Sequence, residues 1–466
     1  MTQALAAYIN RWNAWTSGSV NRRIFAASLT VGAFTFLAHV GTAGKELVVA
    51  YQFGTTDALD AFLIAFLLPS FLVSVVAGSL PSAFIPIYLE VQHHEGHAAG
   101  ERLYAAVIGW GLILLVAISI IMALLSPILL RVLASGFSDE KLNLTRSLYL
   151  MMLPILVFKG LTTIWATKLN ATNQFAFTSA VPILTPIFVV AAILYGSGRW
   201  SIYALAAGTV GGALLEALIL AWYVRSLRVT LFPRWSAWSS DLERVLKQYC
   251  PAIAGALLMA STMLVDQAMA AMLGPGSVST FNYGGKVASF AVAIGATALG
   301  TAVLPHFSRM VAVADWDGLH NTLRTYVTLI LKITIPLTLA AVFLSERIVG
   351  VLFQRGAFTV TDTHMVGEVQ AFLLLQIPLY LAGIIVVRLM SALKANHILM
   401  WGCVLNCLIN VILNYIFMQW LQVAGIALAT FVVYLVSVTF LSYMLRQVLI
   451  GQEEAHRRYS NQDVTR

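Results

Sequence analysis

Twelve long apolar stretches follow one another along the chain, and they constrain its fold more than any other feature. A helix needs about 20 apolar residues to cross a bilayer, because its backbone polar groups must bond internally there. We therefore predict an all-α polytopic membrane protein with about 12 transmembrane helices. The predicted spans cover roughly residues 24–50, 61–89, 103–130, 147–168, 176–196, 201–224, 248–273, 283–308, 325–345, 367–389, 397–419 and 423–445.

The composition excludes a soluble globular protein. Hydrophobic residues make up 59% of the chain and charged residues only 10%, and no polar segment is long enough to form a separate domain. Arg22 and Arg23 precede the first span, which is longer than the apolar core of a signal peptide and has no small-residue cleavage site near it. We expect this first span to stay in the mature protein.

The basic residues indicate orientation in the membrane rather than nucleic-acid binding. The net charge is +8, but lysine and arginine sit in short loops instead of clustering on one soluble face. With the N-terminus in the cytoplasm, 18 of these residues lie on the cytoplasmic side and 6 on the outer side. We therefore predict a multi-pass protein of a bacterial cytoplasmic (inner) membrane with both termini in the cytoplasm.

The chain also repeats itself, which predicts two related halves. Ala83–Tyr88 (AFIPIY) in the first half resembles Ala302–Phe307 (AVLPHF) in the second. Two further pairs, Gly54 with Gly274 and Asn173 with Asn396, have nearly the same separation along the chain. An even number of spans separates the copies, so the halves have the same orientation and are related by an axis along the membrane normal. We predict two pseudo-symmetric six-helix lobes.

The repeat gives a domain organisation with five segments. A polar, tryptophan-containing and arginine-rich seam lies between the sixth and seventh spans and is typical of a helix at the membrane surface. The expected segments are a cytoplasmic N-terminal segment (1–23), a first lobe (24–224), an interfacial linker (225–247), a second lobe (248–446) and a cytoplasmic tail (447–466).

Ionisable residues inside the spans are the candidate functional residues. Each costs about 2.5–3.5 kcal/mol to insert, so such residues are expected to serve a function or to be paired. The candidates are His39, Lys45, Glu46, Lys159, Glu216, Asp266 and Lys286. Lys45, Lys159 and Lys286, with His39, are expected to form a cationic cavity for a phosphate-bearing ligand, since lysine binds phosphate as a point charge.

The carboxylates leave an alternative open. The lysines can instead serve only to neutralise Glu46, Glu216 and Asp266, or these acids can couple transport to Na⁺, H⁺ or the membrane potential. Lys45 and Glu46 are adjacent and point about 100° apart on a helix, so we expect no ion pair between them.

Asp57 and Asp60 lie in the predicted outer loop before the second span. Capping of that helix explains Asp60 well, and charge balance is the other role considered.

Enzymatic and metal sites are not expected. His93 and His97 have the i,i+4 spacing of helical metal ligands, but Gly96 interrupts them and no third ligand is close in sequence. The cysteines, Cys250, Cys403 and Cys407, are expected to be small apolar residues. We find no nucleophile–base motif, phosphate-binding loop or dinucleotide fingerprint, so we predict a transporter without a metal or cofactor.

Several strings resemble one transporter family. These are GKELVVAYQFGTTDALDAFLIAFLLP and AFIPIYLEV in the first half, LFPRW and DLERVLKQYCPAI at the seam, and ALGTAVLPHFSR and VLFQRGAFTVTD in the second half. Together they resemble the MurJ/MviN family of the multidrug/oligosaccharidyl-lipid/polysaccharide exporter superfamily, from the first span to the twelfth. The resemblance implies two six-helix lobes in a V and a flippase for undecaprenyl-pyrophosphate-linked saccharides.

The resemblance also assigns residues and shows departures. His39, Lys45 and Glu46 match charged cavity positions, Lys286 matches an arginine of the second half, and Asp60 matches an aspartate of the outer loop. The lipid II flippases of the family have a double arginine after the proline of the second span, which LPSFLVSVVAGS lacks, and two further C-terminal spans. Arginine grips phosphate bidentately and lysine does not, so head-group recognition is expected to differ.

Because of these differences from the lipid II flippases, we place the expected functions in the following order. First is flipping of a lipid-linked oligosaccharide for exopolysaccharide or another envelope polysaccharide, with a polysaccharide polymerase or glycosyltransferases as further partners and no nucleic acid. The alternatives are a lipid II flippase of peptidoglycan synthesis, an ion-coupled multidrug antiporter and a non-transporting scaffold. The lysines of the spans argue against the antiporter, whose cationic cargo needs an acidic cavity.

Overall fold

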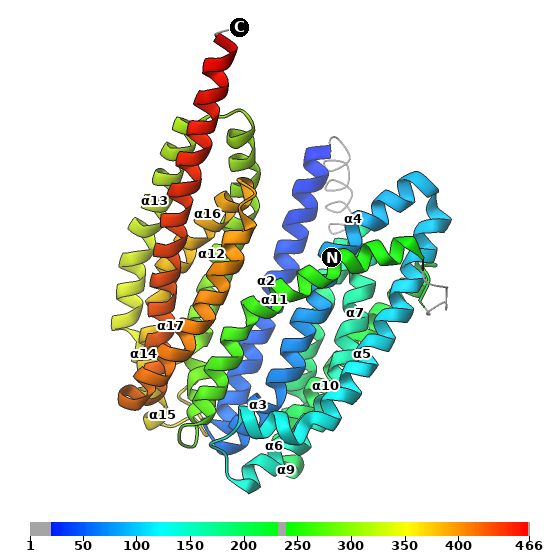
Figure 1. Cartoon of the computed structure of the whole chain (residues 1–466). Coiled ribbons are helices and arrows are strands. Elements are labelled where there is room, and N and C mark those ends of the chain that lie inside the picture. Colours follow the sequence, from blue (N-terminus) through cyan, green and yellow to red (C-terminus); the bar gives the residue numbers. More distant parts are fainter. Residues whose placement is uncertain (1–19, 232–238, 465–466) are drawn as a thin grey trace, which may run out of the picture. The chain divides into compact units, whose positions relative to one another are not determined.

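The fold is all helical, as predicted. A computed structural model describes residues 20–231 and 239–464, and within these ranges it contains helices and no strand (Figure 1). Nine of the helices in these ranges are long and apolar enough to cross a membrane. The elements are α2 (Val20–Phe53), α3 (Asp57–Leu72), the π-helix η1 (Val73–Ala77), α4 (Gly78–Glu95), α5 (His97–Leu133), α6 (Asp139–Met152), α7 (Pro154–Ala171), α8 (Phe175–Ala180), the 3₁₀-helix η2 (Val181–Ile183), α9 (Leu184–Trp200), α10 (Ile202–Ser226), α11 (Ser240–Ala271), α12 (Ser277–Ala312), α13 (Trp316–Phe343), α14 (Ser345–Phe353), α15 (Val360–Leu374), α16 (Gln376–Ala392) and α17 (Asn396–Val464).

Some sequence predictions fall outside the described residues. The predicted N-terminal segment lies there except for 20–23, and so do 232–238 in the middle of the predicted linker. The last two residues of the predicted tail, 465–466, are outside them as well.

Unusual turns recur at corresponding points of the two halves. Ser201, before α10, has φ 46° and ψ −128°. Gln422, which divides α17 into two arms (396–421 and 423–464), has φ 51° and ψ −130°. Asn173 and Lys394 both have left-handed backbones, with φ 63° and 58°. Both pairs have the same separation along the chain, which agrees with that of the sequence repeat, and L-residues adopt such conformations only where the surroundings demand them.

Gly96 separates the histidine cluster. Its φ of 89° ends α4 after Glu95, and α5 begins at His97. His93 and His97 therefore lie on different helices, and the i,i+4 face that the sequence suggested does not form. His93 and His94 contact each other edge to face, with ring centroids 5.2 Å apart.

The chain forms two compact units, which we describe separately. Unit 1 comprises the described residues up to Gln52, Ala65–Pro127 and Arg146–Ala254. Its core is built on large buried side chains such as Tyr88, Tyr104 and Leu156, which come from α4, α5 and α7.

Within unit 1, α9 and α10 pack closely because two small residues leave room. A Cβ added to Gly208 would lie 3.0 Å from the Cα of Val189, and one on Gly212 would lie 2.8 Å from the Cα of Thr185. Small residues four apart let membrane helices approach closely, where van der Waals contact and hydrogen bonds hold them together.

A π-helix interrupts the second membrane-spanning segment of unit 1. Five residues, Val73–Ala77, adopt the wider helix, which leaves backbone groups without their usual partners. The Tyr249 hydroxyl, from α11, donates to the Val76 carbonyl at 2.5 Å. This bond satisfies a buried carbonyl.

Unit 2 contains the second half of the chain and two short segments of the predicted first lobe. It comprises Phe53–Ile64, Ile128–Thr145 and the described residues from Gly255 onward. Its core lies around Phe307, Ile385 and Met390, which come from α12 and α16. The two arms of α17 also pack on this core, through side chains such as Ile398 and Leu441.

Candidate functional site

The candidate site is a cavity inside unit 2, which we call the α11–α17 cavity. Its volume is about 640 Å³, and α11, α12, α15, α16 and both arms of α17 line it. Cavities of this size with a few convergent polar groups are typical of ligand sites. The polar lining residues are Thr262, Asp266, Gln267, Asn282, Lys286, Ser289, Gln376, Tyr380, Asn406, Asn410, Thr430, Tyr434 and Ser437.

Asp266 lies in the wall of this cavity and is held by amides rather than by a lysine. Its carboxylate accepts from the Asn410 side-chain amide at 2.9 Å and from the Asn414 amide at 2.7 Å. Asp266 is 7% exposed and Asn414 is fully buried. None of the ion pairs found among the described residues involves Asp266, so the two amides are its observed partners.

The partners of Asp266 were not among the predicted site residues. Asn406, Asn410 and Asn414 follow one another at intervals of four residues in the first arm of α17. Residues four apart share one face of a helix, so this spacing places three amides in a single stripe. The signal was present in the sequence, because an apolar span has no other reason to carry three such amides on one face.

Lys286 lines the same cavity from α12. It follows Gly284 and Gly285, and a Cβ on Gly284 would lie 2.6 Å from the Val369 side chain. The glycine therefore lets α12 pack closely on α15 at a point two residues before the lysine. The cavity is thus lined by Lys286 from α12 and Asp266 from α11. The sequence predicted phosphate binding for the lysine and ion coupling or charge balance for the carboxylate.

In unit 1, Lys159 and Glu216 form an ion pair within the membrane-spanning region. The Lys159 ammonium is 2.5 Å from the Glu216 carboxylate. Thr185 donates its hydroxyl to the other carboxylate oxygen. Glu216 lies one turn after Gly212 on the face of α10 that packs on α9, which explains why Thr185 reaches it. This ion pair is the arrangement expected if Lys159 serves to neutralise Glu216.

Lys45 and Glu46 also form an ion pair, and here the prediction was wrong. Their charged atoms are 2.7 Å apart, although the residues are adjacent on α2. The separation of about 100° applies to the Cα–Cβ directions, whereas both side chains are long enough to bend toward each other. Pairing of two half-buried charges lowers the cost of placing either in a span. His39, one to two turns earlier on α2, is exposed.

Asp60 caps a helix, but not the helix that the sequence indicated. It lies inside the first turn of α3, and its fully buried carboxylate accepts from the backbone N–H groups of Gly276 and Ser279, each at 2.8 Å. These groups lie at the start of α12, so Asp60 satisfies donors that are distant in the sequence. Lys141 supplies the balancing charge at 2.9 Å and also contacts Asp57.

Glycines allow this close approach within unit 2. A Cβ on Gly276 would lie 2.5 Å from the Thr55 carbonyl oxygen, and one on Gly54 would overlap the Ala357 carbonyl oxygen. Both glycines have left-handed backbones, with φ of 79° and 54°. A side chain at either position would both strain the backbone and clash with another chain segment.

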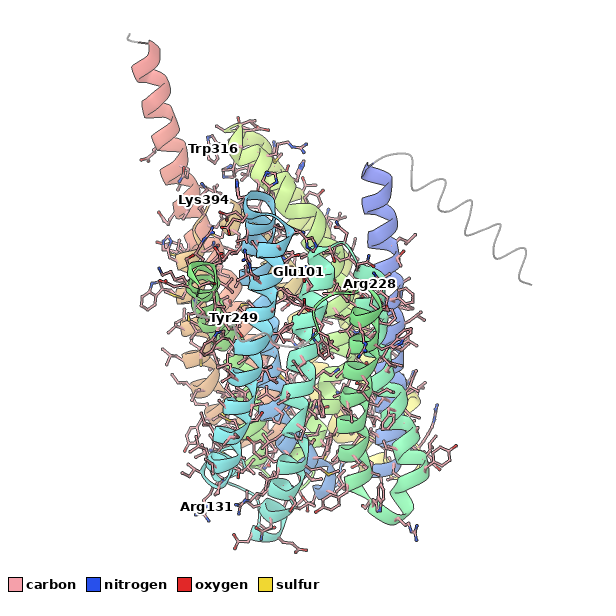
Figure 2. All side chains as sticks on the ribbon, turned by 90° about the vertical axis from the view of Figure 1, so that its right-hand side faces the viewer. Glu101, Arg131, Arg228, Tyr249, Trp316 and Lys394 are labelled. Atoms are coloured by element: carbon pink, nitrogen blue, oxygen red, sulfur yellow. The ribbon has the colours of Figure 1, made fainter. Side chains whose placement is uncertain are left out.

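Lys168, the last residue of the predicted span 147–168, is a buried residue of unit 1. It is 1% exposed and lies 2.5 Å from the Glu101 carboxylate, at the opposite end of α5 from Arg131 (Figure 2). Its ammonium also lies 4.1 Å from the centre of the Tyr88 ring. The ion pair and the ring contact compensate the charge, so Lys168 is a structural residue of this core.

Sequence comparison connects the chain to one family over most of its length. The profile described as Lipid II flippase MurJ matches residues 49–464. A curated relative described as Lipid II flippase MurJ, from Burkholderia cenocepacia, is 29% identical over 379 residues, which cover 79% of this chain and 72% of the relative.

Comparison of folds agrees. A solved structure described as Lipid II flippase MurJ in an inward closed conformation matches with a TM-score of 0.78 and 21% identity, covering 91% of this chain and 90% of the other. An inward-facing multidrug resistance MATE family transporter of the MOP superfamily matches with a TM-score of 0.76 and 12% identity, covering 91% and 99%. These matches confirm the expected fold class and the family resemblance.

Proposed function

Since the chain belongs to the family described as Lipid II flippase MurJ, we propose that it flips a polyprenyl-pyrophosphate-linked saccharide across the cytoplasmic membrane, and that this substrate is lipid II. The sequence analysis placed an exopolysaccharide precursor first, because of the missing double arginine. The lipid II alternative is better supported, since the family profile and the curated Burkholderia relative are both described as lipid II flippases.

The observation that carries the proposal is that Lys286 and Asp266 line the same cavity of a membrane protein. Lys286 offers a point charge to the pyrophosphate. Lys45 and Lys159 are the other candidate contacts, and both are paired with carboxylates in this state. If either lysine exchanges its carboxylate for a phosphate oxygen, the lysine stays paired but Glu46 or Glu216 loses its cation, so the exchange requires that carboxylate to gain a proton or another partner.

Transport in this proposal proceeds by alternating access while the prenyl tail stays in the bilayer. With both termini in the cytoplasm, the inside-negative potential favours outward movement of the anionic pyrophosphate. This contribution is about 2.3 kcal/mol per charge per 100 mV.

Asp266 is the proposed coupling residue, with Glu46 and Glu216 as less favoured candidates because each has a lysine partner. A proton or Na⁺ fits this donor set, because the buried oxygens of Asn414 and Gln267 have no hydrogen-bond partner among the described residues. Hard cations prefer such carboxylate and amide oxygens. When bound, the cation would neutralise Asp266 and so change the charge opposite Lys286. We expect Asp266→Asn to retain lipid binding and to lose the dependence of flipping on pH or Na⁺.

Complementation tests the substrate. The chain is expressed in a strain depleted of its own lipid II flippase, with Lys286→Ala as the comparison and membrane content measured for both. Growth with the natural chain and failure with Lys286→Ala are expected. Failure of the natural chain at normal membrane content would refute lipid II as the substrate and favour an exopolysaccharide precursor. Raised dye resistance on overexpression would instead favour the drug antiporter.

A further inference from the structure

One member of the asparagine stripe has no role in holding Asp266. Asn410 and Asn414 donate to the carboxylate, but Asn406, one turn earlier, donates to the Ser437 hydroxyl at 3.0 Å across the two arms of α17. The side-chain oxygen of Asn406 is buried and has no partner among the described residues. Buried amide oxygens without a donor are rare in native proteins, so this group requires an explanation.

The surroundings of Asn406 define which ligand chemistry fits. Ser437, Tyr380 and Tyr434 line the same cavity, and the two tyrosine rings pack edge to face with centroids 5.5 Å apart. Gln267 contributes a second buried oxygen without a partner in the described part of the chain. This wall therefore offers neutral amide and hydroxyl groups, including two unsatisfied amide oxygens, and aromatic surface near the Asp266 carboxylate.

The charges of the cavity indicate which part of the substrate lies against each wall. Phosphate oxygens are acceptors and carry negative charge, so the Asp266 carboxylate repels them and Lys286 attracts them. Sugar hydroxyls and amide N–H groups are donors, and the C–H faces of a sugar ring pack on aromatic rings. The wall around Asn406 thus suits the saccharide, and Lys286 suits the pyrophosphate attached to it.

We infer that the wall formed by Asn406, Ser437, Tyr380 and Tyr434 is a saccharide subsite, in which Asn406 determines specificity. The Asn406 oxygen accepts from a hydroxyl or amide N–H of the sugar nearest the pyrophosphate. This inference rests on the proposed function, because it uses the lipid-linked substrate that Lys286 binds. A site built to bond a sugar donor discriminates against a ligand that lacks it, because the buried acceptor is then left unpaired.

The test compares two lipids on the full-length chain. Native mass spectrometry measures the affinities of lipid II and of undecaprenyl pyrophosphate, which carries the same anion and tail without the sugars. Asn406→Leu keeps a similar volume and removes the amide. We expect it to weaken lipid II binding about tenfold, which corresponds to about 1.4 kcal/mol, and to leave undecaprenyl pyrophosphate unchanged. Lys286→Ala should weaken both lipids by the same factor.

Matched controls keep the outcomes distinct. Asn321→Leu, on an exposed position of α13, should change neither affinity. Equal loss for both lipids in Asn406→Leu, or no loss for either, would overturn the saccharide subsite while leaving the proposed function intact. Failure of the natural chain to bind either lipid would overturn the proposed function and the subsite together. If Asn406→Leu does not accumulate in membranes, Asn406→Ser is judged by the same ratio of affinities.

Discussion

Removing the two charges of the Lys159–Glu216 ion pair one at a time should destabilise the protein to different extents. The Glu216 side chain is 3% exposed, whereas the Lys159 side chain is 28% exposed. Removal of either charge leaves the other unpaired, but only the lysine has a route to a more polar environment through its long, flexible stem. We therefore expect Lys159→Met to destabilise the protein more than Glu216→Gln.

The magnitudes follow from this difference in burial. Breaking a buried ion pair by removing one partner costs about 3–5 kcal/mol, and Lys159→Met should lie in that range because only Thr185 still bonds Glu216. Glu216→Gln should cost about 2 kcal/mol, since the remaining lysine can extend toward the membrane surface. The double variant contains no unpaired charge, and its stability should be within about 1 kcal/mol of the natural chain.

Equilibrium unfolding in mixed micelles with increasing SDS content measures these free energies. The reasoning is refuted if Glu216→Gln is as harmful as Lys159→Met, or if the double variant is no more stable than the worse single variant. Flipping by the double variant then decides the role of the lysine. Normal flipping means that the pair only neutralises itself, whereas lost flipping at normal stability means that Lys159 or Glu216 takes part in transport.

Three further predictions concern other contacts and use the same unfolding measurement. Asp60→Asn removes the charge between Lys141 and the start of α12, and should cost about 2–3 kcal/mol; a loss under about 0.5 kcal/mol would contradict this role. Tyr249→Phe removes the donor to the Val76 carbonyl and should cost about 1–3 kcal/mol, with Tyr326→Phe on the exposed face of α13 as a neutral control. Gly212→Val should prevent accumulation in the membrane, because its Cβ would overlap α9; normal accumulation would show that α9 and α10 can separate there.

The fold class and the positions of the helices were predictable because they depend on local properties. Hydropathy over about 20 residues determines whether a segment spans the bilayer, and the segment satisfies its own backbone hydrogen bonds. The repeat was visible in short similar strings such as Ala83–Tyr88 and Ala302–Phe307, whereas the matching turns at Ser201 and Gln422 appear only in the backbone angles. The candidate residues Asp266 and Lys286 could be selected because charge is rare and costly in a span.

The partners of these residues could not be predicted with the same rules. Lys45 bends to the adjacent Glu46, and Lys168 is buried against Glu101, although sequence spacing indicated neither pair. Side chains of this length reach several ångströms from their Cβ, so small differences in helix position decide which charge they meet.

The sequence by itself determined that this protein crosses a membrane repeatedly, contains two related halves and carries a small set of charges inside its spans. Only the tertiary structure decided what those charges do. Asp60 satisfies the start of α12, which belongs to the other half of the sequence, and Asp266 meets two amides from α17 rather than a lysine. The physical reason is that hydrophobicity acts segment by segment, whereas a hydrogen bond needs two groups within about 3 Å, which depends on how whole helices pack.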